Sequence, residues 1–275
     1  SFGDLCEIFQ EKITRTIESN KLLNWNEAIY KLHNSDEYKN KSSLSFRRLA
    51  FDEICANLIT LSELRIKIKK SKKVKIFHQN ISNKILKILP FRLTGGQQRT
   101  LEEINSDLNS KNRMFRIMQG DVGSGKTIVS LLAIANVIES GYQCAFMGPT
   151  EILAYQHYNL AKNIYKKLDN KIEFLTGKTD RKKKNEILKN LLKGDIDLII
   201  GTHTLFQKKI NFKNLGFVVI DEQHKFGVQQ RADLAEKGGT NCDVLLMSAT
   251  PIPRTMMMSM YGDMDISKIK DKPLS

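Results

Sequence analysis

One short segment constrains the fold of this chain more than any other feature. It reads Gly120-Asp121-Val122-Gly123-Ser124-Gly125-Lys126-Thr127, the spacing of a phosphate-binding loop, in which glycines let consecutive backbone N–H groups face the phosphates at a helix N-terminus. Such a loop needs a strand before it and a helix after it. Arg116 to Met118 read as the end of a strand, and Ile128 to Ile138 read as a buried helix. The alternative is a glycine-rich turn with an incidental lysine.

Two side chains of this loop have predicted roles in phosphate chemistry. Lys126 is expected to reach the β- and γ-phosphate oxygens, and the hydroxyl of Thr127 is expected to ligate magnesium. The pattern therefore predicts a nucleoside triphosphatase, in which Lys126 is catalytic and the whole loop from Gly120 to Thr127 binds the nucleotide.

A second motif follows at Phe217-Val218-Val219-Ile220, a continuous apolar run typical of a parallel strand buried on both faces. Asp221 comes at its carboxyl end, where an acid can hold magnesium directly or through water. The adjacent Glu222 can orient or deprotonate the attacking water. Gln223 and His224 come next and complete the predicted nucleotide site. The alternative interpretation is an acidic N-cap that begins the next helix.

From Pro90 onward, short apolar segments alternate with amphipathic ones, which predicts a parallel α/β sheet flanked by helices. The expected strands lie at 116–118, 145–147, 172–175, 198–200, 217–220 and 244–247. Polar or glycine-bearing loops follow them, and ligands of such sheets bind at the carboxyl ends of strands. The residues before Pro90 have a helical pattern with no glycine after Gly3. We therefore expect a mostly helical region at 1–89 and an α/β domain at 90–275.

A basic stretch free of acidic residues lies inside the helical region. It comprises Arg65, Lys67, Lys69, Lys70, Lys72, Lys73 and Lys75. Two interpretations stay open: a solvated helix face, or a surface that contacts nucleic-acid phosphates without reading sequence.

Composition supports a sizeable core and a polyanionic partner. The 275 residues suggest about two domains, and 41% of them are hydrophobic. A net charge of +14 favours nucleic acid as a partner, although basic enzymes without that partner also exist. The scattered cysteines and histidines lack metal-ligand spacing, so no metal is expected beyond nucleotide-bound magnesium, and a reducing cytoplasm is the simplest compartment. No signal peptide or long apolar run points to a membrane.

The ordered motifs resemble those of superfamily 2 helicases and, among them, the RecG family of branch-migration helicases. The matching segments are LPFRLTGGQQ at 89–98, GDVGSGKT at 120–127, PTEILAYQH at 149–157, GTHTLFQ at 201–207, IDEQHKFGVQQR at 220–231 and SATPIPRT at 248–255. The stretch FRRLAFDEI at 46–54 resembles the helical linker that precedes the motor in that family. The resemblance implies a RecA-like first motor domain behind a linker, in a chain that is a piece of a longer protein.

The resemblance also implies roles for individual residues. Gln97, behind Phe91, Leu93 and Thr94, matches the glutamine that contacts adenine, and Phe91 is predicted to bind the nucleotide with it. Residues matched to motifs that hold the DNA backbone are Pro149, Thr150, Gly201, Thr202 and His203, with Arg254 in a segment linked to motion on duplex DNA. Ordinary helix capping is the alternative for these loops, since Thr150 would be a reasonable N-cap without DNA. Ser248 to Thr250 would couple the state of the γ-phosphate to DNA, and the nearby methionines 256–258 and 260 are expected to pack in the core.

The family's pattern further implies ATP and magnesium as cofactors, and branched or forked double-stranded DNA as the partner. It also implies a monomer in the bacterial cytoplasm, associated with the nucleoid. The family's N-terminal wedge domain and second motor domain are expected to lie outside this sequence, so the isolated chain should hydrolyse ATP weakly. A transcription-repair coupling translocase is the nearest alternative; Ser124 and Gln223 favour the RecG family over it. A non-catalytic module that binds DNA in response to nucleotide is the other alternative.

Overall fold

The computed structural model describes residues 13–34, 40, 42–68, 71–166, 168–207, 209–221, 239–250 and 264–271. Among these, the residues up to Arg65 form one compact unit and those from Ile66 onward form a second. The predicted combination of a helical region and an α/β domain is confirmed. The compact α/β unit begins before Pro90, however, because the segment from Ser71 to Leu89 belongs to it.

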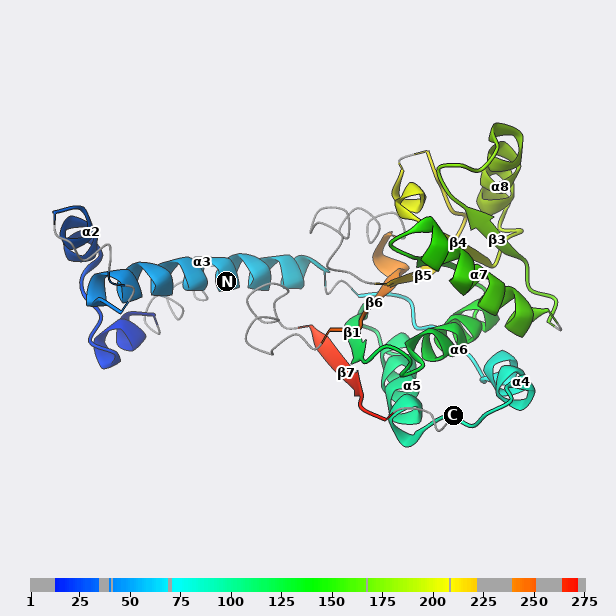
Figure 1. Ribbon diagram of the computed structural model, residues 1–275, viewed down its shortest axis with the longest axis horizontal. Coiled ribbons are helices and arrows are strands. Elements are labelled where there is room, and N and C mark those ends of the chain that lie inside the picture. Colours follow the sequence, from blue (N-terminus) through cyan, green and yellow to red (C-terminus); the bar gives the residue numbers. More distant parts are fainter. Residues whose placement is uncertain are drawn as a thin grey trace. The chain divides into compact units, whose positions relative to one another are not determined.

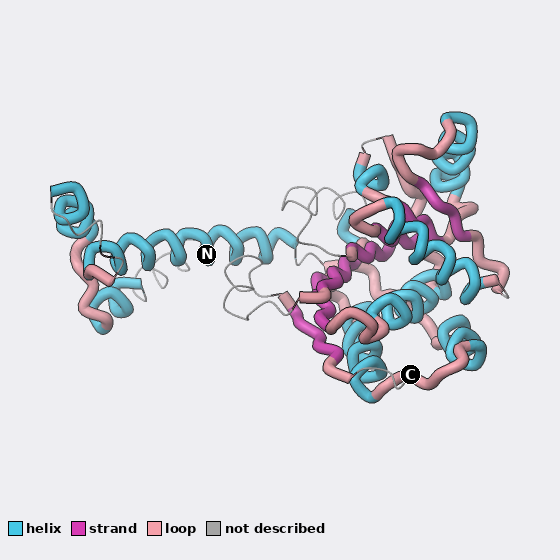
Figure 2. The backbone as a smooth tube through the Cα atoms, in the orientation of Figure 1, coloured by secondary structure: helices cyan, strands magenta, loops and turns pink. Residues whose placement is uncertain are grey.

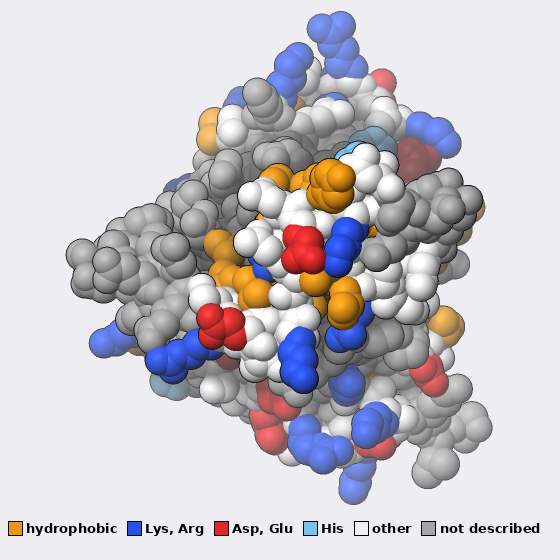
Figure 3. Space-filling model, turned by 90° about the vertical axis from the view of Figure 1, so that its left-hand side faces the viewer, with side chains coloured by type: hydrophobic (Ala, Val, Ile, Leu, Met, Phe, Trp, Pro, Cys, Tyr) orange, Lys and Arg blue, Asp and Glu red, His pale blue; other side chains and the backbone are white. Residues whose placement is uncertain are grey.

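The first unit is helical in its described residues. It contains α2 (Trp25–Asn34) and most of α3 (Leu44–Ile68), and residues 13–19 are also helical. Arg48 on α3 donates to the backbone oxygen of Leu23 at 3.0 Å and to the Asp52 carboxylate at 2.9 Å. Hydrophobic side chains are exposed among charged ones on the face drawn in Figure 3, and the exposed large hydrophobic residues of this unit include Trp25, Tyr30, Leu44, Phe46 and Ile54.

The second unit is built on a parallel sheet whose described strands follow the order β3-β4-β2-β5-β6-β1-β7 (Figures 1 and 2). All neighbouring strands are parallel. Their bounds are β1 (Phe115–Gly120), β2 (Gln143–Met147), β3 (Ile172–Leu175), β4 (Leu198–Gly201), β5 (Leu215–Ile220), β6 (Asp243–Ser248) and β7 (Asp265–Ile269). The predicted strands are all present, and β7 is an additional one at the sheet's edge.

Helices surround this sheet. They are α4 (Asn80–Ile88), α5 (Gly95–Leu108), α6 (Lys126–Glu139), α7 (Glu151–Tyr165) and α8 (Arg181–Lys193). Of these, α6, α7 and α8 join consecutive strands, as parallel crossovers require, whereas α4 and α5 precede β1. Helix α6 is buried along its whole length between Ile128 and Ile138, which explains its apolar sequence. It packs against β1, β2 and β5, while α4 and α5 pack on α6. The predicted buried helix is thus the central helix of the core.

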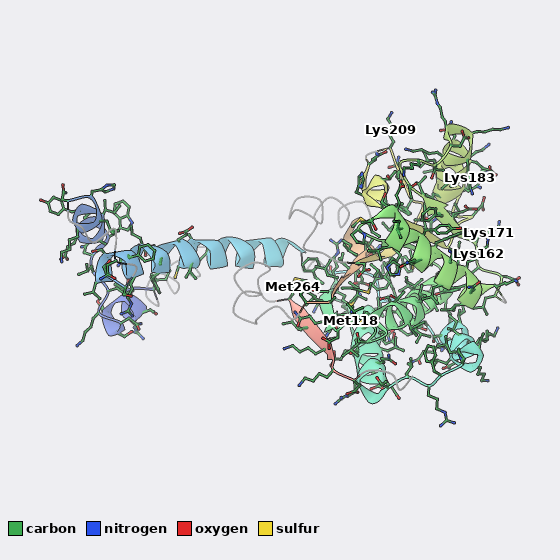
Figure 4. All side chains as sticks on the ribbon, in the orientation of Figure 1. Met118, Lys162, Lys171, Lys183, Lys209 and Met264 are labelled. Carbon is green, nitrogen blue, oxygen red and sulfur yellow. The ribbon has the colours of Figure 1, made fainter. Side chains whose placement is uncertain are left out.

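The lysine-rich surface of this unit lies around α7, β3 and α8. Lys162, Lys171, Lys183 and Lys209 are exposed there, whereas Met118 is buried on β1 and Met264 is buried just before β7 (Figure 4). The helices in the described part of the chain all lack the long apolar stretch that a membrane crossing requires.

Candidate nucleotide site

The phosphate-binding loop connects the carboxyl end of β1 to the N-terminus of α6. Gly123 and Gly125 have φ of +83° and +82°, a left-handed conformation that favours glycine. An ideal Cβ on Gly125 would lie 2.2 Å from Nε2 of Gln97, so the loop also needs glycine there for space. Gly125 is the N-cap of α6 and supplies no side-chain cap. The N–H groups of the first turn are therefore arranged as an anion site requires.

Lys126 folds back over the loop from which it starts. Its Nζ donates to the backbone oxygens of Gly120 at 2.5 Å and Asp121 at 2.9 Å. The hydroxyl of Ser124 is buried and, among the described side chains, has no hydrogen-bond partner. A cationic Nζ and a buried polar group both line the same loop. Both features fit a phosphate ligand.

Gln97 is part of the architecture of this loop. Its side-chain oxygen accepts from the backbone N–H of Thr94 at 2.9 Å, which completes a capping box at the start of α5. Its Nε2 donates to the backbone oxygen of Ser124 at 2.9 Å, and the residue is 1% exposed. The adenine contact stays a prediction, and the bond to the loop is a function that the sequence did not reveal. Phe91, the other residue predicted near the base, is 41% exposed.

Asp221 follows β5 directly and is 8% exposed. Its backbone N–H donates to the oxygen of Met147 at the end of β2, at 2.9 Å. Its Oδ2 lies 2.9 Å from Nε2 of His157 on α7. Only β6 separates β5 from β1 in the sheet, so Asp221 and the phosphate-binding loop both lie at the carboxyl ends of the parallel strands, one strand apart. The predicted residues Glu222, Gln223 and His224 lie outside the described residues, as do Arg254 and the methionines at 256–258 and 260.

The loops with predicted DNA contacts lie side by side. The N–H of Gly148, just before Pro149, donates to the oxygen of Gly201 at 2.9 Å, which links the ends of β2 and β4. Thr150 caps α7 by accepting from the N–H of Leu153 at 3.3 Å, as the capping interpretation expects. Thr202 is buried and its hydroxyl lies 3.3 Å from that of Thr204.

The same edge of the sheet carries three further polar residues of these motifs. His203 is exposed. The Ser248 hydroxyl bonds to the oxygen of Thr250 at 3.1 Å. Glu151 accepts from Lys178 at 2.8 Å, and this hydrogen bond, the main cause, lowers the pKa of the Glu151 carboxyl.

Two lysines of the basic stretch have neither of the predicted roles. Lys72 Nζ lies 2.7 Å from both oxygens of Asp243, and Lys75 Nζ lies 2.6 Å from Asp243 Oδ2, with all three side chains fully buried. They are thus neither a solvated face nor a surface for phosphates. Lys72 also donates to the oxygen of Asp107, and Lys75 to that of Asn241. Burial, the largest cause, lowers the pKa of Lys72, while Asp243 opposes it.

A parallel sheet with a phosphate-binding loop at the carboxyl ends of its strands defines a nucleotide-binding core of the P-loop class. A model of the DEAD/DEAH box helicase family matches residues 94–258. The chain belongs to this family.

Comparison with individual proteins shows which helicases within this family are closely similar in sequence to the chain. The ATP-dependent DNA helicase RecG of Synechocystis sp. is 45% identical over 258 residues, 93% of this chain and 31% of that protein. RecG of Thermotoga maritima is 40% identical over 269 residues, which cover 98% of this chain and 34% of that protein. A structure of RecG bound to a three-way DNA junction superposes with a TM-score of 0.76 at 39% identity, covering 94% of this chain and 35% of that one. The resemblance to RecG helicases is confirmed.

A more distant structure shares the fold alone. It is the DEAD-box helicase Mss116 bound to ssRNA and UDP-BeF, which is 22% identical and superposes with a TM-score of 0.54 over 70% of this chain and 43% of that one. The chain spans about a third of the length of the RecG proteins it matches.

Proposed function

We propose that this chain is the ATP-binding first motor domain, with its helical linker, of a DNA helicase that acts on branched DNA. The observation that carries the proposal is the loop from Gly120 to Thr127 at the end of β1, with Asp221 on the same edge of the sheet. From the sequence motifs we divide the chain into a linker at 1–89 and a motor domain at 90–275, and we add the segment from Ser71 to Leu89 to the motor because it belongs to the same compact unit. The relatives named ATP-dependent DNA helicase RecG support this assignment.

Different residues of the chain bind the phosphates, hold the metal and position the attacking water. Bound ATP with magnesium supplies the γ-phosphoryl group whose transfer to water releases the free energy for motion. The loop's N–H groups and Lys126 neutralise phosphate charge. Thr127 and Asp221 hold the metal, and Glu222 orients or deprotonates the attacking water.

Two further residues, Phe91 and Gln97, hold the adenine. Because Gln97 also bonds to Ser124, base recognition and loop position are linked through one amide.

We assign DNA binding to Pro149, Thr150, Gly201, Thr202 and His203, and also to Arg254, which lies outside the described residues. Hydroxyl and N–H groups at strand ends suit phosphate contacts, which position a duplex without reading its sequence. The bond from Gly148 to Gly201 supports a single surface formed by two of these loops. The RecG structure with a three-way DNA junction supports a branched substrate.

Other parts of the longer protein complete the machine. A wedge domain splits the fork, and a second motor domain supplies an arginine to the transferring phosphoryl group, which raises turnover by about 10³ to 10⁵. The isolated chain is therefore a weak ATPase, and we propose that the whole protein works as a monomer in the cytoplasm.

ATP hydrolysis by the full-length protein tests this function. It would be measured with fork, four-way junction, linear duplex or no DNA, at two salt concentrations. We expect the strongest stimulation with forks and junctions, a loss of turnover in Lys126→Ala, and no loss in the exposed control Lys111→Ala. Equal stimulation by plain duplex would favour a transcription-repair coupling translocase. Nucleotide binding without turnover would favour a non-catalytic module.

A further inference from the structure

The carboxylate of Asp221 is held by His157, a residue for which the sequence analysis predicted no role. His157 Nε2 lies 2.9 Å from Asp221 Oδ2, and both side chains are 12% exposed. The imidazole also packs against the Phe146 ring on β2, with centroids 4.6 Å apart and planes tilted by 44°. The ring is therefore fixed by an aromatic contact and by a hydrogen bond at Nε2.

The chemistry of the pair defines the direction of this bond. An ionised carboxylate can only accept, so Nε2–H of His157 donates and one lone pair of Oδ2 is used. A carboxylate with one oxygen held in this way cannot rotate freely about its Cβ–Cγ bond. Groups that hydrogen-bond to a metal-binding carboxylate fix its orientation and tune metal affinity.

The position of His157 in α7 adds a second element. The helix begins after Thr150, in a loop proposed to contact the DNA backbone, and His157 lies two turns later, about 10 Å along the axis. One rigid helix thus carries a DNA-contacting loop at its start and the partner of Asp221 at its middle. A displacement of α7 on DNA would move the imidazole relative to the carboxylate.

We propose that His157 is a positioning residue that orients Asp221 for magnesium and transmits DNA contact along α7 to the nucleotide site. This inference rests on the proposed function of Asp221 and Thr150. It assigns no proton transfer to the histidine. Its role is geometric, and it therefore depends on a donor at the position of Nε2.

Variants of the full-length protein separate geometry from packing. His157→Leu removes the donor and introduces an apolar side chain of related size. His157→Gln instead places an amide N–H near the position of Nε2. Asn159→Ala is the matched control, because this exposed residue lies on the same helix outside the motif. Thermal unfolding of each variant would be recorded first.

Two measurements follow on the same proteins. Mn²⁺ binding in the presence of a fluorescent ATP analogue would be measured by electron paramagnetic resonance, and binding of the analogue alone would be measured with a chelator. We expect His157→Leu to weaken metal binding about 10- to 100-fold with unchanged chelator-resistant binding. His157→Gln and Asn159→Ala should stay within about threefold of wild type. The ratio of junction-stimulated to basal hydrolysis should fall only in His157→Leu.

Wild-type Mn²⁺ affinity in a folded His157→Leu variant would overturn the proposal. An equal loss of Mn²⁺ affinity in His157→Leu and His157→Gln, together with a lowered thermal midpoint in both, would also overturn it. Such a result would mean that the imidazole ring contributes only to packing. If the wild-type protein itself bound nucleotide without any effect of metal, the proposed function would fail first, and this result is visible before any variant is compared.

Discussion

The buried carboxylate of Asp243 gives a sharp test of how the segment before α4 is held on the sheet. Its two oxygens accept from Lys72, Lys75 and the backbone N–H of Met114, at distances of 2.6 to 2.7 Å. Two ammonium groups without solvent exposure depend on this one negative charge. The perturbation we choose is Asp243→Asn, which keeps the size of the side chain and removes the charge.

The expected loss follows from the burial of the partners. Removing one member of a buried ion pair leaves an uncompensated charge and costs about 3–5 kcal/mol. With a urea m-value of about 3 kcal/mol/M, the midpoint of unfolding should fall by about 1 to 2 M. Lys75→Met should cost less, about 1–2 kcal/mol, because it leaves a neutral pair of Lys72 and Asp243. The exposed Asp195→Asn control should stay within about 0.5 kcal/mol of wild type.

The pH dependence gives an independent check with a defined sign. Burial lowers the pKa of Lys72 below 10.5 in the folded chain. The unfolded chain therefore binds more protons between the lowered pKa and 10.5, so this group makes stability rise with pH in that window. Asp243 raises the same pKa, and its loss widens the window toward lower pH. Asp243→Asn should thus regain stability with rising pH over a wider range, beginning at a lower pH than in wild type.

Equilibrium unfolding in urea, followed by circular dichroism at several pH values, measures both effects. An Asp243→Asn midpoint within about 0.3 M of the Asp195→Asn control would refute the reasoning. A variant that is destabilised equally at neutral and alkaline pH would refute the account of the buried ammonium groups.

Three further tests have defined outcomes. Glu139→Ala removes the carboxylate that accepts backbone N–H groups at the start of α4 and should cost about 0.5–2 kcal/mol, with faster amide exchange there. Gly125→Ala should abolish nucleotide binding, because its Cβ meets Gln97, whereas Gly141→Ala, with a similar φ of +79° and open space, should cost only about 1–2 kcal/mol of backbone strain. Burial raises the pKa of the Cys242 thiol to about 12, so iodoacetamide at pH 8 should label it only after unfolding, as peptide mass spectrometry would show.

Most of the strands that the sequence predicted are buried on both faces, and the exception is the edge strand β3, where only Leu175 is buried. β5 is buried at every position, so its apolar run was visible without any tertiary information. β7 was missed for the opposite reason. It lies at the edge of the sheet beside β1, and its residues Asp265 and Lys268 are exposed while Ser267 and Ile269 are buried. A strand covered on one side has no continuous apolar run.

In the candidate site too, residues within local sequence patterns were predicted, whereas contacts between distant parts of the chain were not. The phosphate-binding loop and Asp221 were predicted because glycine spacing and an acid after an apolar run are local patterns. The partner of Asp221 was not, because His157 lies 64 residues away in sequence, although it ends a motif that the sequence analysis recognised. Gln97 was predicted from a motif, but its bond to Ser124 depends on how α5 packs beside the loop.

Long-range pairing also explains why the sequence did not predict the roles of Lys72 and Lys75. Lys72 and Lys75 pair with Asp243 across 171 and 168 residues, and no charge pattern within the stretch indicates that partner. The pairing has a structural consequence, because Asp243 begins β6 and Ser248 ends it. β6 lies between β5, which leads to Asp221, and β1, which leads to the phosphate-binding loop. The segment that contains both lysines therefore holds the first residue of the strand between the two halves of the nucleotide site. It belongs to the core of the motor physically, although its composition resembles a linker.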